Sequence, residues 1–129
     1  MKSREMYEVE TLSDFDKEFA RFVKKKKFKT LPKQIDELID KFEIGEFDGK
    51  RLTYSEIPTP HEVYKLRLPN LDTKVGQSNG YRVIYMVVTE TKIVVIMTIY
   101  YKKEDATISD TYINGLIDGY FINSLPEED

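Results

Sequence analysis

The sequence predicts an α+β fold of two layers, with helices packed on an antiparallel sheet. Two segments within residues 13–45 have apolar residues at helical spacing, and a third such segment follows residue 109. Residues 62–101 contain three segments rich in β-branched and aromatic residues, which favour strands. The expected order is β-α-α-β-β-β-α. A chain of 129 residues is expected to form a single domain over 1–129 and to bury a core without metal or disulfide.

The N-terminal elements are a short strand and a helix. Residues 6–10 alternate between apolar and polar side chains, as a strand does. Ser13 is expected to cap the first helix, with Asp16 in the capping-box position. The lysines at 24–27 follow the end of this helix, where cations complement its partial negative charge. The apolar stripe consists of Phe15, Phe19, Phe22 and Val23.

A second helix is expected from near Thr30, with Pro32 in its first turn and Gly45 after its last. Its apolar stripe consists of Ile35, Leu38, Ile39 and Phe42. Residues 46–61 contain an Asp-Gly pair and two prolines, so we expect a loop or irregular connector there.

The three strands are predicted at 62–68, 81–88 and 93–101, the last two forming a hairpin. The second and third are apolar on both faces, which indicates central strands covered on both sides. Ser109 is expected to cap the final helix. The first strand alternates, with Val63, Lys65 and Arg67 on one face and Tyr64, Leu66 and Leu68 on the other.

Charge is unevenly distributed along the chain. The net charge is −3, but residues 62–104 carry +3 and residues 105–129 carry −6. The global charge argues against a nucleic-acid partner, because phosphate neutralisation drives such binding. The local charge argues for one, and the acidic tail either stays away from the basic face or shields it.

Several classes of site are not expected. The chain has no cysteine, and its one histidine, His61, is interpreted as an ordinary loop residue between the prolines and the first strand. No glycine loop of the phosphate-cradling type is present, and no cofactor or metal is expected. The start of the sequence has no apolar signal-peptide core and no segment is apolar enough to span a membrane, so a cytoplasmic location is expected.

Basic side chains are expected to meet at one end of the sheet. In an antiparallel hairpin, the start of the strand containing Arg82 lies beside the end of the strand preceding Lys102 and Lys103, and Arg67 joins them. The alternative is that the Lys-x-Arg pair is simply solvent-exposed, because such pairs are common on the solvent-facing side of a strand. Such cations can grip phosphate and stabilise developing charge, a crowded lysine can transfer protons, and a nearby tyrosine can stack on an unpaired base.

Three segments of this region carry a family resemblance: Val-Tyr-Lys-Leu-Arg at 63–67, Gly-Tyr-Arg-Val-Ile-Tyr at 80–85 and Thr-Ile-Tyr-Tyr-Lys-Lys-Glu at 98–104. Together they resemble the RelE/HigB-like branch of the RelE/ParE toxin superfamily. The resemblance implies a RelE-like fold and the toxin of a type II toxin–antitoxin system. Many such toxins are endoribonucleases that cut mRNA on the ribosome by attack of the RNA's own 2′-hydroxyl, which requires no metal.

The resemblance also implies roles for individual residues. Arg82 matches the arginine that holds the scissile phosphate, and either Tyr100 or Tyr101 stacks on a base. The implied partners are a cognate antitoxin, expected to be a small helix-turn-helix protein, together with the ribosome and mRNA. The implied catalytic residues are Lys65, Arg67, Arg82 and Lys103, and the implied RNA-binding residues are Tyr100, Tyr101 and Lys102.

Two departures keep a second hypothesis open. The family's toxins are usually basic, whereas this chain has a pI of about 5.3, and its loop at 69–79 is longer than in compact members. The ParE branch shares the fold and acts on DNA gyrase by protein contact, so the fold leaves the activity open. The alternative is therefore a non-catalytic protein-binding module, either a gyrase-type inhibitor or an inactive relative.

Overall fold

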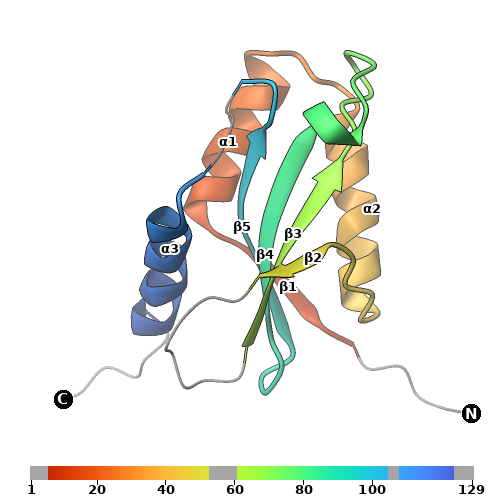
Figure 1. The fold of residues 1–129 in the computed structure, drawn as a ribbon. Coiled ribbons are helices and arrows are strands. Elements are labelled where there is room, and N and C mark those ends of the chain that lie inside the picture. Colours follow the sequence, from red (N-terminus) through yellow and green to blue (C-terminus); the bar gives the residue numbers. More distant parts are fainter. Residues whose placement is uncertain (1–5, 53–60, 105–107, 124–129) are drawn as a thin grey trace, which may run out of the picture.

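The computed structural model describes residues 6–52, 61–104 and 108–123. In it, a sheet separates two helices on one face from a third on the other (Figure 1). The predicted α+β class is confirmed, although helices cover both faces rather than one. The elements in chain order are β1 (Glu8–Thr11), α1 (Ser13–Lys24), α2 (Leu31–Glu43), β2 (Lys50–Leu52), β3 (His61–Leu68), the 3-10 turn η1 (Gln77–Asn79), β4 (Tyr81–Val88), β5 (Ile93–Tyr101) and α3 (Asp110–Asn123).

The sheet is mixed, with the strand order β1-β5-β4-β3-β2. β1 runs parallel to β5, with Glu8 opposite Ile93, so the prediction of a wholly antiparallel sheet is wrong for this pair. The remaining pairs are antiparallel. The backbone N–H of Leu12 donates to the carbonyl of Ile96 at 3.0 Å, and α1 begins at the next residue, so the direction of β1 places α1 on the sheet.

β2 lies in the segment predicted to be a connector, and that prediction is wrong for its three residues. Gly49, directly before β2, allows the backbone to come close to β3, because its φ of +114° is one that glycine adopts without strain. A Cβ at this position would lie 2.7 Å from the carbonyl oxygen of Lys65. Part of the predicted connector, residues 53–60, lies outside the described residues.

The two predicted central strands are confirmed at their predicted bounds, and every residue of β4 is buried. Alternation along β4 divides the core between the two faces. On one face, Tyr81, Val83, Tyr85 and Val87 pack with the helical stripes of α1 and α2. On the other face, Ile84, Met86 and Val88 pack with Ile113 and Ile117 of α3.

The ends of the helices differ in how they are capped. Ser13 is the first residue of α1 and no side chain caps that helix, so the predicted capping box is wrong; the hydroxyl of Thr11 donates to Asp16 instead. Gly45 follows α2 at a φ of +82°, as predicted. The predicted cap of the last helix is confirmed, because the N–H of Tyr112 donates to Ser109 Oγ at 3.1 Å.

Within the described ranges, no helix has both the length and the apolar composition needed to cross a bilayer.

Candidate nucleic-acid interface

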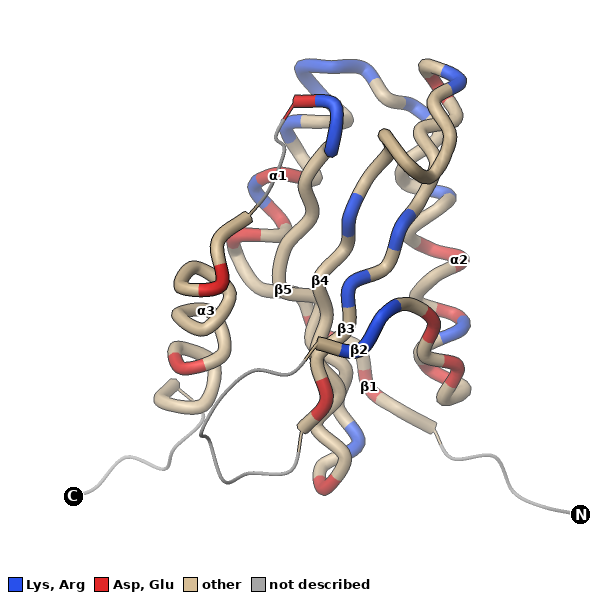
Figure 2. Tube along the Cα trace, viewed as in Figure 1, with Lys and Arg blue, Asp and Glu red and all other residues tan. Residues whose placement is uncertain are grey.

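The register of the three central strands brings the predicted cations to one end of one sheet face. Arg67 on β3 is paired with Arg82 on β4, and Arg82 is paired with Tyr100 on β5. Paired residues project on the same side of a sheet, so these side chains form a row across three strands. Basic positions follow β2, β3 and the adjoining part of β4, whereas α3 carries acidic positions (Figure 2).

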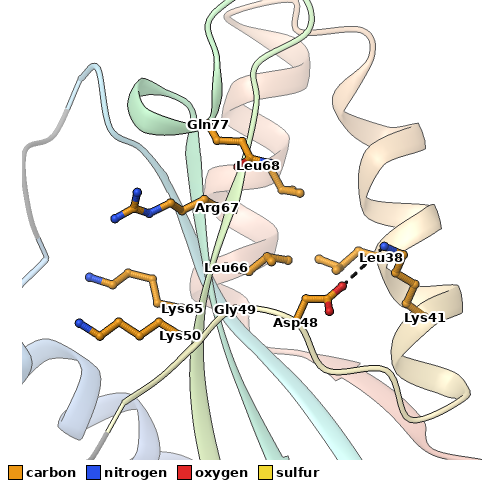
Figure 3. Close-up of a pocket in the computed structure, with 10 residues that line it drawn as sticks. All are labelled: Leu38, Lys41, Asp48, Gly49, Lys50, Lys65, Leu66, Arg67, Leu68 and Gln77. Atoms are coloured by element: carbon orange, nitrogen blue, oxygen red, sulfur yellow. Dashed lines mark ion pairs between the residues drawn. The ribbon is translucent and has the colours of Figure 1, made fainter.

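β2 extends this row with a residue that the sequence did not identify. Lys50 is paired with Lys65, and the side chains of Lys50, Lys65 and Arg67 project to the same side (Figure 3). Lys50 was missed because it lies in the segment predicted to be irregular, where alternation gives no facing direction. We call Lys50, Lys65, Arg67, Arg82 and Lys102 the cation cluster.

Lys65 is the member of the cluster on which burial and the neighbouring charges act together. Burial lowers the pKa of Lys65, and the charges of Lys50, Arg82, Lys102 and Arg67 lower it further, in that order. Among the ion pairs of the described residues, none includes Lys50, Lys65 or Arg67. Lys50, Lys65 and Arg67 therefore hold positive charge that these ion pairs do not neutralise, which favours an anionic ligand.

Arg82 is the buried member of the cluster, with 4% of its surface exposed. Its Nη1 donates to the carbonyls of Gln77 at 2.8 Å and Tyr81 at 3.2 Å, and its Nη2 donates to Ser78 at 2.8 Å. Burial lowers its pKa, as does the charge of Arg67. Part of the guanidinium thus fixes η1 against β4, while Arg67 beside it is exposed and available to a ligand.

The two candidate stacking tyrosines lie on opposite faces. Tyr100 lies on the face of the cluster, where burial raises its pKa although Arg82 and Arg67 act to lower it. Tyr101 is 4% exposed and lies in the other core, where its ring contacts Phe22 and Phe28 and its hydroxyl is 3.1 Å from that of Thr73. Of the two tyrosines, Tyr100 is the one beside the cations, and it too is buried, with 8% of its surface exposed.

The turn after β5 carries the last two predicted cations. The N–H of Lys102 donates to the carbonyl of Gly80 at 2.8 Å, which ties the turn to the start of β4. Lys102 is among the charges that act on Lys65, whereas Lys103 is exposed in the turn. Glu104 holds the turn from the other side, through ion pairs of 3.1 Å with Arg21 and with Lys26.

A pocket of about 450 Å³ adjoins the cluster, between β3, the start of β2 and α2 (Figure 3). Lys50, Lys65 and Arg67 line it together with apolar side chains and Gln77. Lys41 and Asp48, which also line it, form an ion pair of 3.6 Å with each other.

His61 takes no part in the cluster. It is the first residue of β3 rather than a loop residue, and its ring centroid lies 5.4 Å from that of Phe121. In the part of the chain that the structure describes, no group of three or more His, Cys, Asp or Glu side chains could hold a metal ion.

No protein-family model matches the sequence, and no curated protein matches it. The solved structures that are similar to this one include three RelE structures. The isolated RelE toxin of E. coli has 20% sequence identity and a TM-score of 0.49, and the match covers 87% of this chain and 97% of that one. The RelE–RelB complex of Pyrococcus horikoshii OT3 has 18% identity and a TM-score of 0.44, with coverage of 75% and 96%. A double arginine-to-alanine mutant of E. coli RelE in the free state has 20% identity and a TM-score of 0.45, with coverage of 78% and 88%. At such identities, the likeness concerns the fold and not the activity.

Proposed function

We propose that this chain is the toxin of a type II toxin–antitoxin pair and that it cleaves mRNA on the ribosome. The observation that carries the proposal is the cation cluster, in which exposed Arg67 and crowded Lys65 lie beside Tyr100 without an ion-pairing carboxylate among the described residues. The three sequence motifs that resemble the toxin superfamily supply the same residues.

In the proposed reaction, the 2′-oxygen of the RNA attacks the adjacent phosphorus and the bond to the 5′-oxygen breaks. The products are a 2′,3′-cyclic phosphate and a 5′-hydroxyl. Lys65 accepts the proton of the 2′-hydroxyl, because a lowered pKa increases the neutral fraction of its amine. Lys102 donates a proton to the leaving oxygen; it is favoured over Lys103 because its charge acts on Lys65.

The remaining groups of the site bind and orient the substrate. Arg67 binds the phosphate oxygens. The N–H groups of Arg82 that do not donate to backbone carbonyls stabilise the negative charge that develops on these oxygens. Tyr100 supports an unpaired base next to the cleaved bond. Lys50 extends the cations along the RNA backbone.

The test is to express the chain in translating cells and to map the 5′ ends of mRNA. We expect new ends with the parent, and about 100-fold fewer with Arg67→Ala or Lys65→Ala, since removal of one transition-state donor typically costs 10²–10³ in rate. Lys33→Ala, an exposed cation on α2, is the matched control and keeps full cleavage. An Arg82→Ala variant as toxic as the parent would show that the site is assigned wrongly.

A non-catalytic protein-binding module is the second candidate. It is favoured by the net charge of −3 and by the hydrogen bonds that occupy part of Arg82. Growth arrest without new mRNA ends would establish this reading over cleavage.

The proposed partners are the ribosome with its mRNA and a cognate antitoxin, and the proposed location is the cytoplasm, where translation occurs. The antitoxin is expected to be a small helix-turn-helix protein. Co-expression of a neighbouring reading frame of that kind is expected to restore growth. An arrest that no neighbouring frame relieves would contradict the antitoxin pairing.

A further inference from the structure

Lys65 lies at the border between an apolar and a basic part of one sheet face. On the apolar side, its neighbours are Val63, two residues earlier on β3, and Ile84, its partner on β4. Both are buried, with 1% and 0% of their surface exposed. On the basic side, its neighbours are Arg67, two residues later, and Lys50, its partner on β2. This position explains why burial and neighbouring charges act together on the amine of Lys65.

The basic side of this face suits a small anion. The Cβ atoms of paired residues on adjacent strands lie about 4.5–5.5 Å apart, and residues two apart on one strand are separated by about 6.6 Å. Lys50, Lys65 and Arg67 project to the same side, so one phosphate group is within reach of all three (Figure 3). The carboxylate of Asp48 lies on the opposite side and forms an ion pair of 3.6 Å with Lys41 (Figure 3).

Lys65 differs chemically from the two cations beside it. The guanidinium of Arg67 stays protonated and is no nucleophile, and Lys50 is exposed at the sheet edge. Lys65 is half-buried, and its lowered pKa increases the fraction of neutral amine, which is the nucleophilic form. A nucleophile therefore lies beside two groups that can hold an anion. This combination favours reaction with an electrophile that carries its own negative charge.

We propose that Lys65 is an acylation site whose donor is an acyl phosphate. Lys50 and Arg67 bind the phosphate oxygens of the donor, and the neutral amine of Lys65 attacks the adjacent carbonyl carbon. A bond forms between this nitrogen and the carbon, and the bond from the carbon to the phosphate oxygen breaks. The departing phosphate takes the proton that the nitrogen loses. The products are an N-acylated lysine and hydrogen phosphate.

The short spacing between the cations and the amine selects this donor over an acyl thioester of coenzyme A. In an acyl phosphate, a single oxygen atom joins the phosphorus to the carbonyl carbon. Cations that hold the phosphate therefore also hold the carbon beside Lys65. In the thioester, the long pantetheine chain separates the phosphates from the carbonyl, so Lys50 and Arg67 would hold the phosphates without positioning the reacting carbon.

The acylation itself does not depend on the activity proposed above, but its consequence rests on that proposal. Acylation converts the amine into an amide, which carries no positive charge and accepts no proton at neutral pH. An acylated Lys65 therefore cannot accept the proton of the RNA 2′-hydroxyl. The modification switches off the proposed cleavage while Lys50 and Arg67 keep their charges.

The experiment treats the full chain with acetyl phosphate, with acetyl-coenzyme A or with the neutral reagent N-hydroxysuccinimidyl acetate. Peptide mass spectrometry follows the acetylation rate of Lys65, with Lys33, exposed on α2, as the reference within the same chain. Lys50→Gln and Arg67→Gln each remove one proposed phosphate contact. Lys17→Gln, which removes an exposed cation of α1, is the matched control. Inorganic phosphate is added as a competitor, which tests the phosphate contacts without any substitution.

We expect acetyl phosphate to acetylate Lys65 at least about tenfold faster than Lys33, because hydrogen bonds to a charged group contribute roughly this factor. Lys50→Gln and Arg67→Gln should each slow the reaction of Lys65 with acetyl phosphate roughly three- to tenfold. Excess inorganic phosphate should slow it as well, and Lys17→Gln should not. With N-hydroxysuccinimidyl acetate, phosphate should have no effect, because this reagent carries no charge for the cations to hold.

Equal rates at Lys65 and Lys33, or a rate at Lys65 that inorganic phosphate does not lower, overturn the proposal. Faster acetylation of Lys65 by acetyl-coenzyme A than by acetyl phosphate at equal concentration overturns the assignment of the donor. Mapping of mRNA ends is a separate measurement. Absence of cleavage by the unmodified chain refutes the proposed function and leaves the acetylation rates measurable, whereas cleavage without preferential acetylation of Lys65 refutes the acylation site alone.

Discussion

Replacement of Gly80 by alanine tests the junction on which the cation cluster depends. A Cβ at this position would lie 2.1 Å from the carbonyl oxygen of Leu68, 3.0 Å from that of Gly76 and 3.0 Å from the Cα of Pro69. Ordinary contact begins at 3.4 Å, and all three atoms are backbone, so no side chain can rotate away. The end of β3 and the start of β4 must therefore separate by roughly 1 Å, a backbone shift of the kind that overpacking causes.

We expect Gly80→Ala to lower the free energy of unfolding by about 2–3 kcal/mol, the upper part of the range for inserting a methyl group into a packed region. In a domain of this size, that corresponds to a fall in Tm of roughly 6–12 °C. The carbonyl of Gly80 accepts from Lys102, and the carbonyls of Gln77 and Ser78 hold Arg82, so the same shift disturbs both cations.

Urea unfolding followed by circular dichroism measures the effect, with Gly76→Ala as the matched control. Gly76 has a φ of −70° and no atom within 4 Å of its would-be Cβ, so alanine there should change stability by less than about 0.5 kcal/mol. Equal stability of the two variants would refute the reasoning, because it would mean that the close approach at Gly80 is not maintained in solution.

Three further predictions concern charge and capping. Burial acts to raise the pKa of Glu104, but the hydrogen bonds and charges of Arg21 and Lys26 together outweigh it and lower the pKa. The stabilisation from Glu104 is therefore present above the ordinary value of 4.5 and is lost as pH falls through the lowered pKa. Glu104→Gln should cost about 0.5–1 kcal/mol at pH 7 and nothing in strong acid, as measured by urea unfolding against pH. The lowered pKa of Lys65 makes its charged form destabilising, so stability again rises as pH increases, here from that pKa to 10.5. Lys65→Met should remove this rise and increase the urea midpoint at low salt, and an unchanged midpoint would contradict it. Asp72→Ala should cost about 1 kcal/mol, because the Asp72 carboxylate accepts from the N–H of Thr30 at 3.1 Å at the start of α2; the loss is checked against Asp36→Ala on the exposed face of the same helix.

The parts of the fold that the sequence predicted well are those with long patterns. β4 and β5 are unbroken runs of β-branched and aromatic residues, and burial on both faces produces such runs. The direction of β1 was missed, because alternation is the same for parallel and antiparallel neighbours. β2 was missed because three residues at a sheet edge are too few to show a pattern.

The candidate site was predictable to the extent that it depends on strand register. Arg67 and Arg82 were expected at one end of the sheet, and the register pairs them. Lys50 comes to the cluster through a strand that carries no sequence signal. Alternation alone could have placed Tyr100 and Tyr101 on opposite faces, but deciding which face carries the cations required the register of β5 against β4.

The pairing of β1 with β5 has a consequence for how the chain is made. Glu8 is among the first described residues, and its neighbour Ile93 is synthesised 85 residues later. A contact between such distant residues closes a long loop, which slows folding and cannot occur before the later partner has left the ribosome. β1 can therefore pair with its neighbour only after β5 has been synthesised. Products that terminate before β5 can assemble neither the complete sheet nor the turn that brings Lys102 to the other cations.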